Sequence, residues 1–483
     1  MNFPTTTALI AALRSGEISA TEALEQSIAR IEARDGELNA VVVRDFERAR
    51  SASAAAEAAL SRGERRALLG VPMTVKESFN VAGLPTTWGI PGAQTHSQSD
   101  AAAVSRLRAS GAVVIGKTNI PTGLADLQCA NPVYGVTRNP WNLNRTPGGS
   151  SGGAAAALAA GFVGLELGSD LGGSLRFPAH CCGVFSHKPT HGIVPLRGHA
   201  PPGTPELSVA VHTDLAVAGP MARCAADLTL AMDVLAGPDA AQAAGYSLAL
   251  PPPRRSRLSE FKILMLEEHP LLPLSIEIRI AMRQFADDLR RIGCVVEQSS
   301  PLLPDLIVLS DTFTRLLMAP IGAGLPQAAY AGLQQRVAQL PAGDSSREFL
   351  RARALVASHR DWLTADRVRA SLTHQWNQLF RTWDLVLCPV LPTTAFAHDS
   401  AEMDQRRVDI DGRAVPFGAQ VAWAALASVS GLPATVMPIG VGSSGLPIGI
   451  QIVGAYLEDR STMAFADLAE REFGGFVPPP GYP

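Results

Sequence analysis

The segment GSDLGGSLR, residues 168–176, combines a glycine pair, a serine and two opposite charges. Glycines let backbone N–H groups approach a substrate closely, because no Cβ stands in the way. Such groups can hold an oxyanion while a neighbouring hydroxyl attacks the carbonyl carbon. We therefore predict that Ser174 is a nucleophile, with helix capping as its alternative role. We expect Asp170 and Arg176 to form an ion pair or a backbone clamp that holds the turn.

A serine nucleophile needs a base, and Lys76 is the main candidate. It follows the apolar segment LLGVPMTV, where burial would disfavour the charged amine. Burial lowers a lysine pKa from about 10.4 by up to roughly 3 to 5 units, which reaches the range of a general base. Arginine cannot lose its proton in this way. The 41 basic residues include only four lysines, kept either for this property or by codon bias: Lys76, Lys117, Lys188 and Lys262.

The segment TPGGSSGGAAAALAAG, residues 146–161, supplies further hydroxyls. A flexible linker is one interpretation, and a phosphate loop is another, although the P-loop lysine is missing. Gly148, Ser150 and Gly152 also match G-x-S-x-G, the nucleophile elbow of α/β-hydrolases, which would make Ser150 the attacking group. Such an elbow must follow a strand. The preceding segment NPWNLNRTP is polar and interrupted by prolines, which argues against it.

Four histidines after the nucleophile segment raise a Ser-His-Asp triad or a zinc site as alternatives. Prolines interrupt this part of the chain, and it contains no H-E-x-x-H helix motif. We therefore predict no metal site, and attack by Ser174 implies no organic cofactor. The histidines concerned are His180, His187, His191 and His199.

Composition excludes several classes of partner. The net charge of -3 and the pI of 6.4 leave no basic surface for nucleic acid. The six cysteines form no C-x-x-C pair, which fits a reducing compartment. The N-terminal segment is amphipathic, and no run reaches the roughly 18 apolar residues of a membrane span. We expect a cytoplasmic protein without a nucleic-acid or membrane partner.

The elements that position these residues follow an α/β pattern. Residues 1–65 are predicted to be helical, and short apolar runs then alternate with helices and glycine-rich turns. No linker or internal repeat divides the chain, so we predict one domain, residues 1–483. Residues 66–245 and 420–470 would form its catalytic α/β core, and residues 246–419 a variable segment that shapes the substrate site. The proline-rich tail FVPPPGYP is expected to be a surface extension.

Three separated segments resemble the amidase signature family of serine hydrolases. They are PMTVKES, then GGSSGG, then GSDLGGSLRFP, whose serine lies 24 residues after Ser150. The resemblance extends through GKTNIPTG, NPVYGVTRNPWN and HKPTHGIVP to GLPIGIQIVG, and it is weak only over about 245–415. It implies a single large domain with a central mixed, twisted β-sheet covered on both sides by α-helices.

The same resemblance implies a Ser-Ser-Lys triad and an acyl-enzyme intermediate. Ser174 would be the nucleophile, Lys76 the base, and Ser150, after a cis peptide bond, the proton relay. Ser151 would support Lys76, while Asp170 and Arg176 would hold the nucleophile loop. The oxyanion hole would consist of the N–H groups of Leu171, Gly172, Gly173 and Ser174, and the substrate contacts would include Leu127, Gln128 and Gly149.

Two positions bear on which amidase this is. Glu166 stands on the strand before the nucleophile loop, where the family usually has a small residue, and strand alternation puts it on one face with Gly168 and Asp170. Phe177 stands where the glutaminase subunits of tRNA-dependent amidotransferases usually have glutamine. Apolar residues outside the motifs predict that the substrates are small apolar or aromatic amides, with anilides, esters and carbamates as related substrates. These residues are Leu127, Tyr134, Leu316, Leu317, Met318, Ile321 and Trp423.

Two alternatives stay open at this stage. One is a glutaminase-type subunit that works only with partner subunits. The other is an α/β-hydrolase-like esterase with Ser150 as its nucleophile. The resemblance also leaves open whether the chain forms a homodimer.

Overall fold

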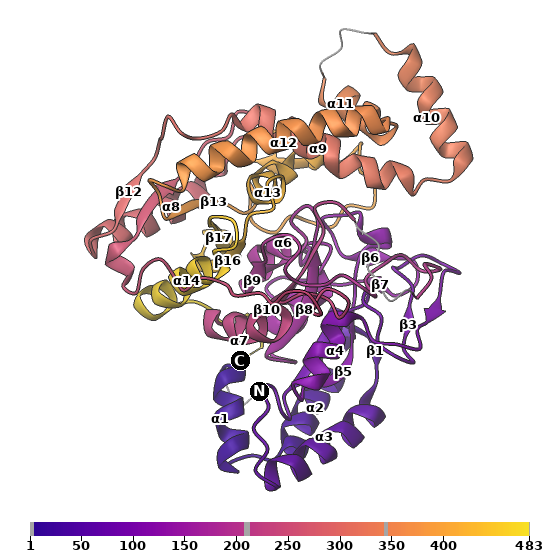
Figure 1. The fold of residues 1–483 in the computed structure, drawn as a ribbon, viewed down its shortest axis with the longest axis vertical. Helices are drawn as coiled ribbons and strands as arrows, with labels where there is room; N and C mark the ends of the chain where they lie inside the picture. The colour runs from indigo at the N-terminus through magenta and orange to yellow at the C-terminus, as the bar shows by residue number, and fades with distance from the viewer. Residues whose placement is uncertain (1–3, 207–212, 342–345, 483) are drawn as a thin grey trace.

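A computed structural model describes residues 4–206, 213–341 and 346–482 (Figure 1). Its centre is an eleven-stranded sheet that runs through the whole molecule. In spatial order the strands are β1 (Val41–Arg44), β5 (Val113–Thr118), β2 (Pro72–Lys76), β8 (Leu165–Asp170), β10 (Val217–Ala222), β9 (Phe185–Lys188), β16 (Ala434–Val441), β17 (Pro447–Val453), β13 (Leu385–Pro389), β11 (Lys262–Met265) and β12 (Val295–Glu297).

Strand direction changes along this sheet. β5, β2 and β8 run parallel to one another, as do β13, β11 and β12. The other neighbours are antiparallel, so the sheet is mixed. β2 lies inside the first parallel group and is buried along its whole length. The α/β class and the mixed central sheet that the sequence predicts are confirmed.

One face of the sheet is covered by α2 (Ala20–Leu38), α5 (Gly152–Ala159) and α6 (Arg176–Cys182). α2 starts at a capping box, in which Ser19 and Glu22 satisfy each other's backbone N–H groups. α5 contains only glycine, alanine and one leucine, and all its residues are buried. Because these side chains are small, α5 lies close against β2, β5 and β8.

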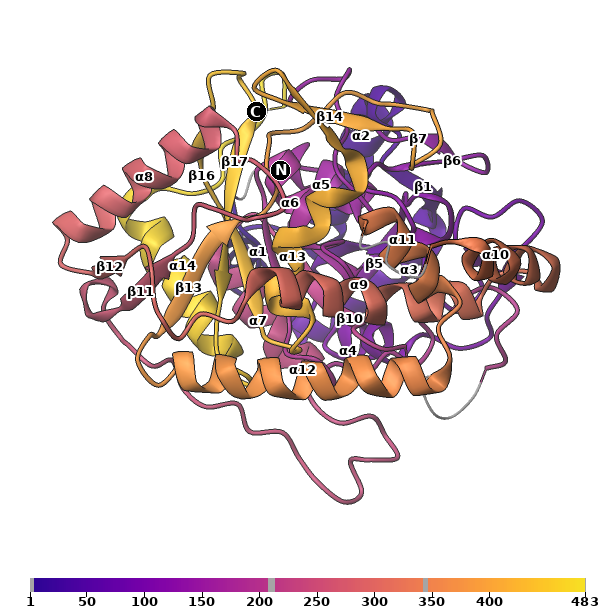
Figure 2. The same cartoon turned by 90° about the horizontal axis from the view of Figure 1, so that it is seen from above.

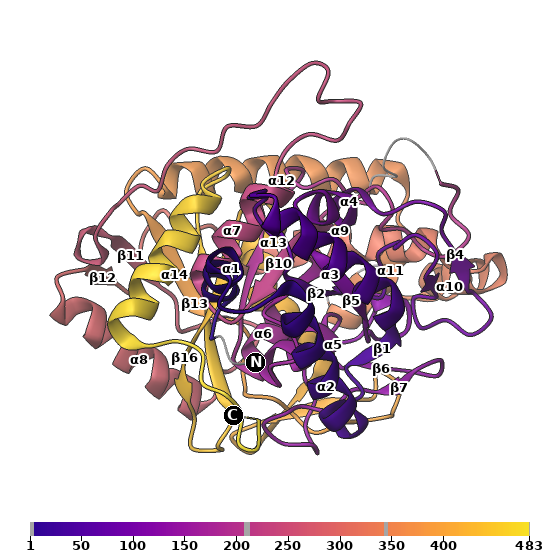
Figure 3. The ribbon, with the colours of Figure 1, turned by 90° about the horizontal axis from the view of Figure 1, so that it is seen from below.

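The opposite face carries a larger apolar core and a different set of helices. In α8, the buried residues Ile278, Met282, Phe285 and Leu289 recur at helical spacing and face that core. α3 (Phe46–Ser61) packs beside β5 and α2 at the β1 edge. Figure 3 shows α1, α2 and α3 from below. The helices of this second face are α1 (Thr6–Ser15), α4 (Ala102–Ala109), α7 (Ala225–Leu235), α8 (Ile276–Arg291) and α14 (Asp459–Phe473).

A separate group of helices gathers above the sheet in Figure 1, with α12 along its edge in Figure 2. Apolar side chains from most of these helices form a third core with residues of β11 and β13. Most of this group comes from the stretch 246–419, where the family resemblance is weakest. The helices are α9 (Leu306–Ala323), α10 (Gln327–Gln339), α11 (Arg347–Leu355), α12 (His359–Leu379) and α13 (Ala422–Ser428).

Several short elements lie outside the central sheet. Three two-stranded pairs are β3 (Pro85–Thr86) with β4 (Thr95–His96), β6 (Ala130–Asn131) with β7 (Gly135–Val136), and β14 (Arg407–Ile410) with β15 (Arg413–Pro416). Single 3-10 turns occur at Thr122–Leu124, Leu258–Glu260 and Phe417–Val421.

One expectation about the chain ends is wrong, and another holds only in part. Residues 1–65 are not helical throughout, because β1 follows the left-handed cap Asn39 and pairs antiparallel with β5. The proline-rich tail lies largely at the surface, as expected, with Val477 exposed, but its end packs into the core. Tyr482 is only 8% exposed and packs in the core beneath α2, with Arg34 over its ring.

Of the helices that the structure describes, α9 is long and apolar enough to span a membrane by length and composition. It packs against α11, α12 and α13, and buries Phe313 and Leu316. A core helix passes the same test, so α9 is weak evidence for a membrane segment.

Candidate active site

Lys76 is the last residue of β2, and its side chain is completely buried. Its Nζ lies 2.7 Å from Ser150 Oγ, 2.9 Å from Ser151 Oγ and 3.0 Å from Ser169 Oγ. The Ser169 carbonyl oxygen is 3.3 Å away. The amine is therefore enclosed by hydroxyl groups from two different segments of the chain.

Burial lowers the pKa of Lys76 to about 7, although Asp170, Cys129 and Glu166 act in the opposite direction. Desolvation penalises the ammonium form, and no carboxylate of the described residues forms an ion pair with Nζ. Near neutral pH a large share of this amine is therefore uncharged and able to accept a proton.

Ser150 and Ser151 form the turn that leads into α5. The peptide bond between Gly149 and Ser150 is cis, as the resemblance implies. Close packing explains the glycines on either side of this turn. A Cβ on Gly149 would lie 2.4 Å from the Asp126 carbonyl oxygen, and one on Gly153 would lie 2.3 Å from the Asn119 nitrogen. The Gly/Ser segment is thus a tightly packed turn and not a flexible linker.

The nucleophile loop lies beside this turn. The Ser151 N–H donates to the Ser174 carbonyl oxygen at 3.1 Å, which holds the two segments together. The Ser174 side chain is partly exposed, unlike Lys76 and Ser150. Its Oγ makes no hydrogen bond with any described residue. Ser174 and Ser150 are therefore not joined by a hydrogen bond in this structure. Such catalytic contacts often tighten only when substrate is bound.

The backbone of the nucleophile loop offers several free N–H groups. Those of Leu171, Gly172 and Ser174 have no partner among the described residues. The Gly173 N–H differs, because it donates to the Asp170 carboxylate at 2.8 Å. Gly173 has a φ of +112°, and a Cβ there would lie 2.3 Å from the Phe177 ring. Only glycine fits this position.

Asp170 and Arg176 form the ion pair that the sequence predicts. Both side chains are buried, and Arg176 donates to Asp170 at 2.8 and 3.0 Å. The carboxylate also accepts the Leu175 N–H at 3.0 Å. Burial alone would raise the pKa of Asp170, but Arg176 and the Gly173 N–H lower it to about 2. The pair therefore clamps the loop.

Arg176 continues this network away from the loop. It donates to Ser428 Oγ at 2.8 Å, to Gln451 Oε1 at 2.6 Å and to the Ala424 carbonyl oxygen at 2.9 Å. These groups belong to α13 and to β17. One guanidinium thus joins the nucleophile loop to the opposite half of the sheet.

The three predicted substrate contacts lie together, but their roles differ. The backbone of Leu127 and Gln128 packs directly against Gly149. The side-chain amide of Gln128 is engaged with the backbone of Asp399, at 2.8 and 2.9 Å. Gln128 thus ties this loop to residues of the variable segment, and its side chain is not free to face a ligand in this state.

Ser169 was missed by sequence reasoning. Its hydroxyl contacts Lys76 as closely as that of Ser151 does. The sequence does show this hydroxyl, since Ser169 is the other serine within GSDLGGS. Alternation along β8, however, groups Glu166, Gly168 and Asp170 on one face and leaves Ser169 out.

The alternatives to this site find little support in the geometry of the described residues. No strand leads into Ser150, because β7 ends at Val136 and the next element is α5. His180 contacts the backbone of β17, while His187 contacts Asp459 and His199 contacts Ser78. Within the described ranges no three His, Cys, Asp or Glu side chains are grouped so that they could hold a metal ion.

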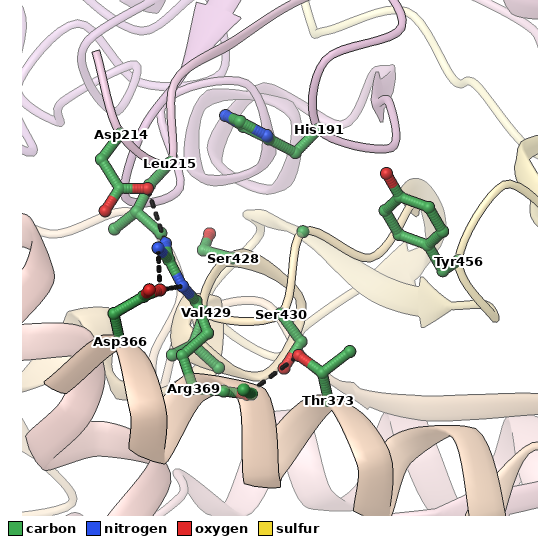
Figure 4. A pocket seen from close by; sticks show the side chains of 12 residues that line it. His191, Asp214, Leu215, Asp366, Arg369, Thr373, Ser428, Val429, Ser430 and Tyr456 are labelled. Carbon is green, nitrogen blue, oxygen red and sulfur yellow. Dashed lines mark hydrogen bonds and ion pairs between the residues drawn. The ribbon is translucent and has the colours of Figure 1, made fainter. Parts of the chain in front are cut away.

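A separate cavity of about 400 Å³ lies between α12 and the segment 428–431 (Figure 4). None of its lining residues belongs to the predicted triad. Its central charge, Arg369, is paired with Asp214 and Asp366. Ser428 lines this cavity and also accepts from Arg176.

The sequence profile of the Amidase family matches residues 22–463. One component of the glutamyl-tRNA(Gln) amidotransferase of Anaeromyxobacter dehalogenans is 33% identical over 96% of this chain and 95% of its own length. The chain belongs to the amidase signature family. As an amidase, it hydrolyses carbon–nitrogen bonds of amides, which is the enzyme class predicted from the sequence.

Other members of the family show the range of chemistry around this amidase. The indoleacetamide hydrolase of Bradyrhizobium diazoefficiens is 33% identical over 95% of this chain and 85% of its own length. The solved structure of a bacterial aryl acylamidase of the amidase signature family has a TM-score of 0.79 and 26% identity, covering 97% of this chain and 96% of that one.

Proposed function

We propose that this amidase hydrolyses small apolar or aromatic amides in the cytoplasm through Lys76, Ser150 and Ser174, without other protein components. The observation that carries the proposal is the buried Lys76 amine, bonded to Ser150 Oγ at 2.7 Å on the turn that holds Ser174. A neutral amine has two N–H groups and one lone pair. It can donate to Ser151 and Ser169 while it accepts the Ser150 proton.

The proposed reaction has two steps that share one acyl-enzyme. Ser174 Oγ attacks the carbonyl carbon, and its proton passes through Ser150 to Lys76. The oxyanion is held by the free N–H groups of Leu171, Gly172 and Ser174, and collapse of the adduct breaks the C–N bond. The proton then returns through Ser150 to the departing amine. Water, activated by the same groups, releases the acid and regenerates Ser174.

We assign Gly173 a different role from the oxyanion-hole donor that the resemblance implies. Because its N–H donates to Asp170, it is occupied before any substrate arrives. We assign Gly173 to the shape of the loop and the neighbouring amides to the oxyanion. Removing one donor of such a hole typically costs about 3 kcal/mol of transition-state stabilisation.

The proposed preference for apolar amides rests on the apolar side chains that pack near the Ser174 loop. A Cβ on Gly172 would lie 3.5 Å from the Phe313 ring and 3.7 Å from Leu317, both on α9. Leu171 packs on the same core. These side chains present hydrocarbon to any group bound at the oxyanion site. Tyr134, Met318, Ile321 and Trp423 remain further predicted contacts.

The glutaminase alternative has a specific observation in its favour, which is the amidotransferase component that matches 96% of this chain. Phe177 argues against it here. Its buried ring fills the space beneath Gly173, where a glutamine would offer polar groups. A glutaminase subunit is expected to release ammonia from glutamine only within its complex.

One assay separates these functions. The purified chain is incubated with an aromatic amide, an anilide, an aryl carbamate, an ester and glutamine. We expect turnover of amide or anilide by the chain alone, and a loss of at least about 10³-fold in Ser174→Ala and Lys76→Ala. Failure of the chain alone to turn over any of these substrates, including glutamine, would favour the amidotransferase function.

Labelling identifies the nucleophile directly. A fluorophosphonate should modify Ser174, as located by mass spectrometry of peptides. Modification at Ser150, in the wild type and in Ser174→Ala, would instead support the esterase alternative.

A further inference from the structure

The cavity between α12 and the segment 428–431 is not used by the proposed reaction. Its volume of about 400 Å³ lies within the range of roughly 300–1,000 Å³ that small-molecule sites occupy. Figure 4 shows Asp214, Asp366 and Arg369 at one end of the cavity and Tyr456 at the other. The lining also contains hydroxyl groups and apolar side chains, so it offers polar and apolar contacts to one ligand.

Arg369 is the guanidinium of this cavity, and each of its nitrogens already has a partner. Its Nη1 donates to Asp214 at 2.6 Å and its Nε donates to Asp366 at 2.8 Å. Its Nη2 donates to Asp366 as well. An anionic ligand would have to compete with these two carboxylates for the guanidinium. The cavity is therefore poorly suited to a phosphate or a carboxylate ligand.

The charge balance of the lining favours a cation instead. Two carboxylates face one guanidinium, so negative charge is in excess. The side chains of Asp214 and Arg369 are only 18% and 21% exposed, so solvent and salt screen their charges less than they screen surface charges. The other titratable residues of the described lining are His191 and Tyr456.

Two oxygen atoms of the lining are buried without a hydrogen-bond partner among the described residues. They are Asp214 Oδ2 and Ser430 Oγ, and Ser430 as a whole is only 7% exposed. A buried polar atom without a hydrogen bond costs free energy, so such atoms mark places where a ligand or water binds. A carboxylate oxygen can only accept, and a hydroxyl can accept as well as donate. Both atoms suit a ligand that carries N–H donors.

Apolar groups supply another part of the lining. Leu215 and Val429 are buried and belong to the third core. Ala370 lines the cavity from the exposed side of α12, and Tyr456 presents a ring that is 47% exposed. An aromatic ring can pack on hydrocarbon or bind a cation on its face. A ligand with an apolar body therefore finds surface to cover beside the charged end.

We propose that this cavity is a second ligand site of the amidase, for a small organic ammonium ion with an apolar body. The excess negative charge of the Asp214–Arg369–Asp366 group attracts the ammonium, and the body packs along Leu215 and Val429. No bond is made or broken at this site. The inference does not depend on the proposed catalytic triad.

Calorimetric titration of the full chain tests the charge preference. The probe is benzylammonium, with benzyl alcohol and benzoate as a neutral and an anionic analogue of similar size. The titration is run at pH 8, above the usual titration range of histidine. We expect saturable binding of benzylammonium, binding of benzyl alcohol that is at least about tenfold weaker, and no measurable binding of benzoate.

Two variants locate the bound probe. Asp366→Asn removes the excess negative charge, and we expect benzylammonium to bind at least about fivefold more weakly. Ala370→Trp places a large ring in the cavity from an exposed position, and binding should be lost. Asp287→Asn is the matched control, because Asp287 also pairs with an arginine three residues later, Arg290 at 2.9 Å, and lies outside the cavity lining. Ser428 is not varied, because it also accepts from Arg176.

A thermal shift gives a second readout, since a ligand that binds the folded chain raises its melting temperature. Benzylammonium should raise it in the wild type and in Asp287→Asn, and not in Ala370→Trp. Benzoate binding as tightly as benzylammonium would overturn the inference, and so would benzylammonium binding that is unchanged in Asp366→Asn and Ala370→Trp. Absence of saturable binding at millimolar concentration would also overturn it, because the cavity would then hold only water.

Discussion

The smallest unit that explains this site is one amine among three hydroxyls. Lys76 Nζ lies within 3.0 Å of the hydroxyl oxygens of Ser150, Ser151 and Ser169. When the amine is neutral, two of these contacts can use its N–H bonds and the third can use its lone pair. A charged ammonium could satisfy the same hydroxyls, but burial works against it. In the proposed mechanism, protonation of this nitrogen switches the base off.

The pH dependence of the wild-type enzyme follows from this nitrogen. The pKa of Lys76 is about 7 in the folded protein, below its ordinary value, and the protonated amine cannot act as the base. We expect kcat/KM to fall with decreasing pH through about 7, approaching tenfold per unit below it. Initial rates of amide hydrolysis between pH 5 and 9 check this. A flat profile across that range would contradict the role of Lys76.

Gly173 allows a prediction at the same scale. Gly173→Ala places a Cβ 2.3 Å from the Phe177 ring at a φ of +112°. We expect at least tenfold lower kcat/KM and a lower melting temperature, since the loop cannot keep its shape. Gly192→Ala is the control, because Gly192 has a φ of +87° and open space around it. Equal effects in both variants would show that the positive φ, and not the contact with the Phe177 ring, causes the loss.

At the scale of elements, the clamp between β8 and α6 holds the nucleophile loop. Asp170 ends β8 and Arg176 begins α6, so the loop between them is closed by a buried ion pair and by N–H bonds to the same carboxylate. The loop is thus fixed at both ends before substrate binds. Its free N–H groups need little rearrangement to meet an oxyanion.

Breaking the clamp should cost stability as well as activity. Arg176→Met leaves the Asp170 carboxylate buried without its partner, and we expect a loss of about 3–5 kcal/mol in the free energy of unfolding. Arg471→Met removes an exposed pair with Asp467 and should cost about 1 kcal/mol or less. Urea denaturation of both variants compares them. Similar midpoints would mean that the buried pair contributes no more than a surface one.

The sequence predicts the strands that carry chemistry better than those that do not. β2, β5 and β8 stand out because apolar runs end in polar motif residues. β1 does not, because four residues between two helices give too short a pattern. The Asp170–Arg176 pair follows from nearby opposite charges. The Gly173 N–H bond to Asp170 and the approach of Ser169 to Lys76 depend on the path of the loop, which no spacing in the sequence specifies.

For the whole molecule, the two chain ends and the sheet form one connected body. The N-terminal turn of α1 is held by Asp227 of α7, which accepts from the N–H groups of Thr6 and Thr7 at 2.6 and 2.8 Å. The C-terminal tail returns to α2, where Tyr482 enters the core. Segments that seem peripheral in the sequence therefore help to cover both faces of the sheet.

The tail supplies a prediction for the whole molecule. Tyr482→Ala removes a ring that is only 8% exposed, and we expect a loss of about 2–3 kcal/mol in the free energy of unfolding. Tyr456→Ala, at a side chain that is 47% exposed, should cost about 0.5 kcal/mol or less. Melting temperatures by calorimetry measure both. Activity per folded molecule should stay unchanged in Tyr482→Ala, since the ring does not reach the triad.

The scarcity of lysine has a practical side. Lys76, Lys117 and Lys188 are enclosed by protein, whereas Lys262 on β11 is exposed. An amine-reactive dye or resin should therefore attach at one side chain, besides the α-amino group. β11 stands near the far end of the sheet from β2. With the α-amino group blocked, coupling through Lys262 would anchor the enzyme at the end of the sheet away from β2.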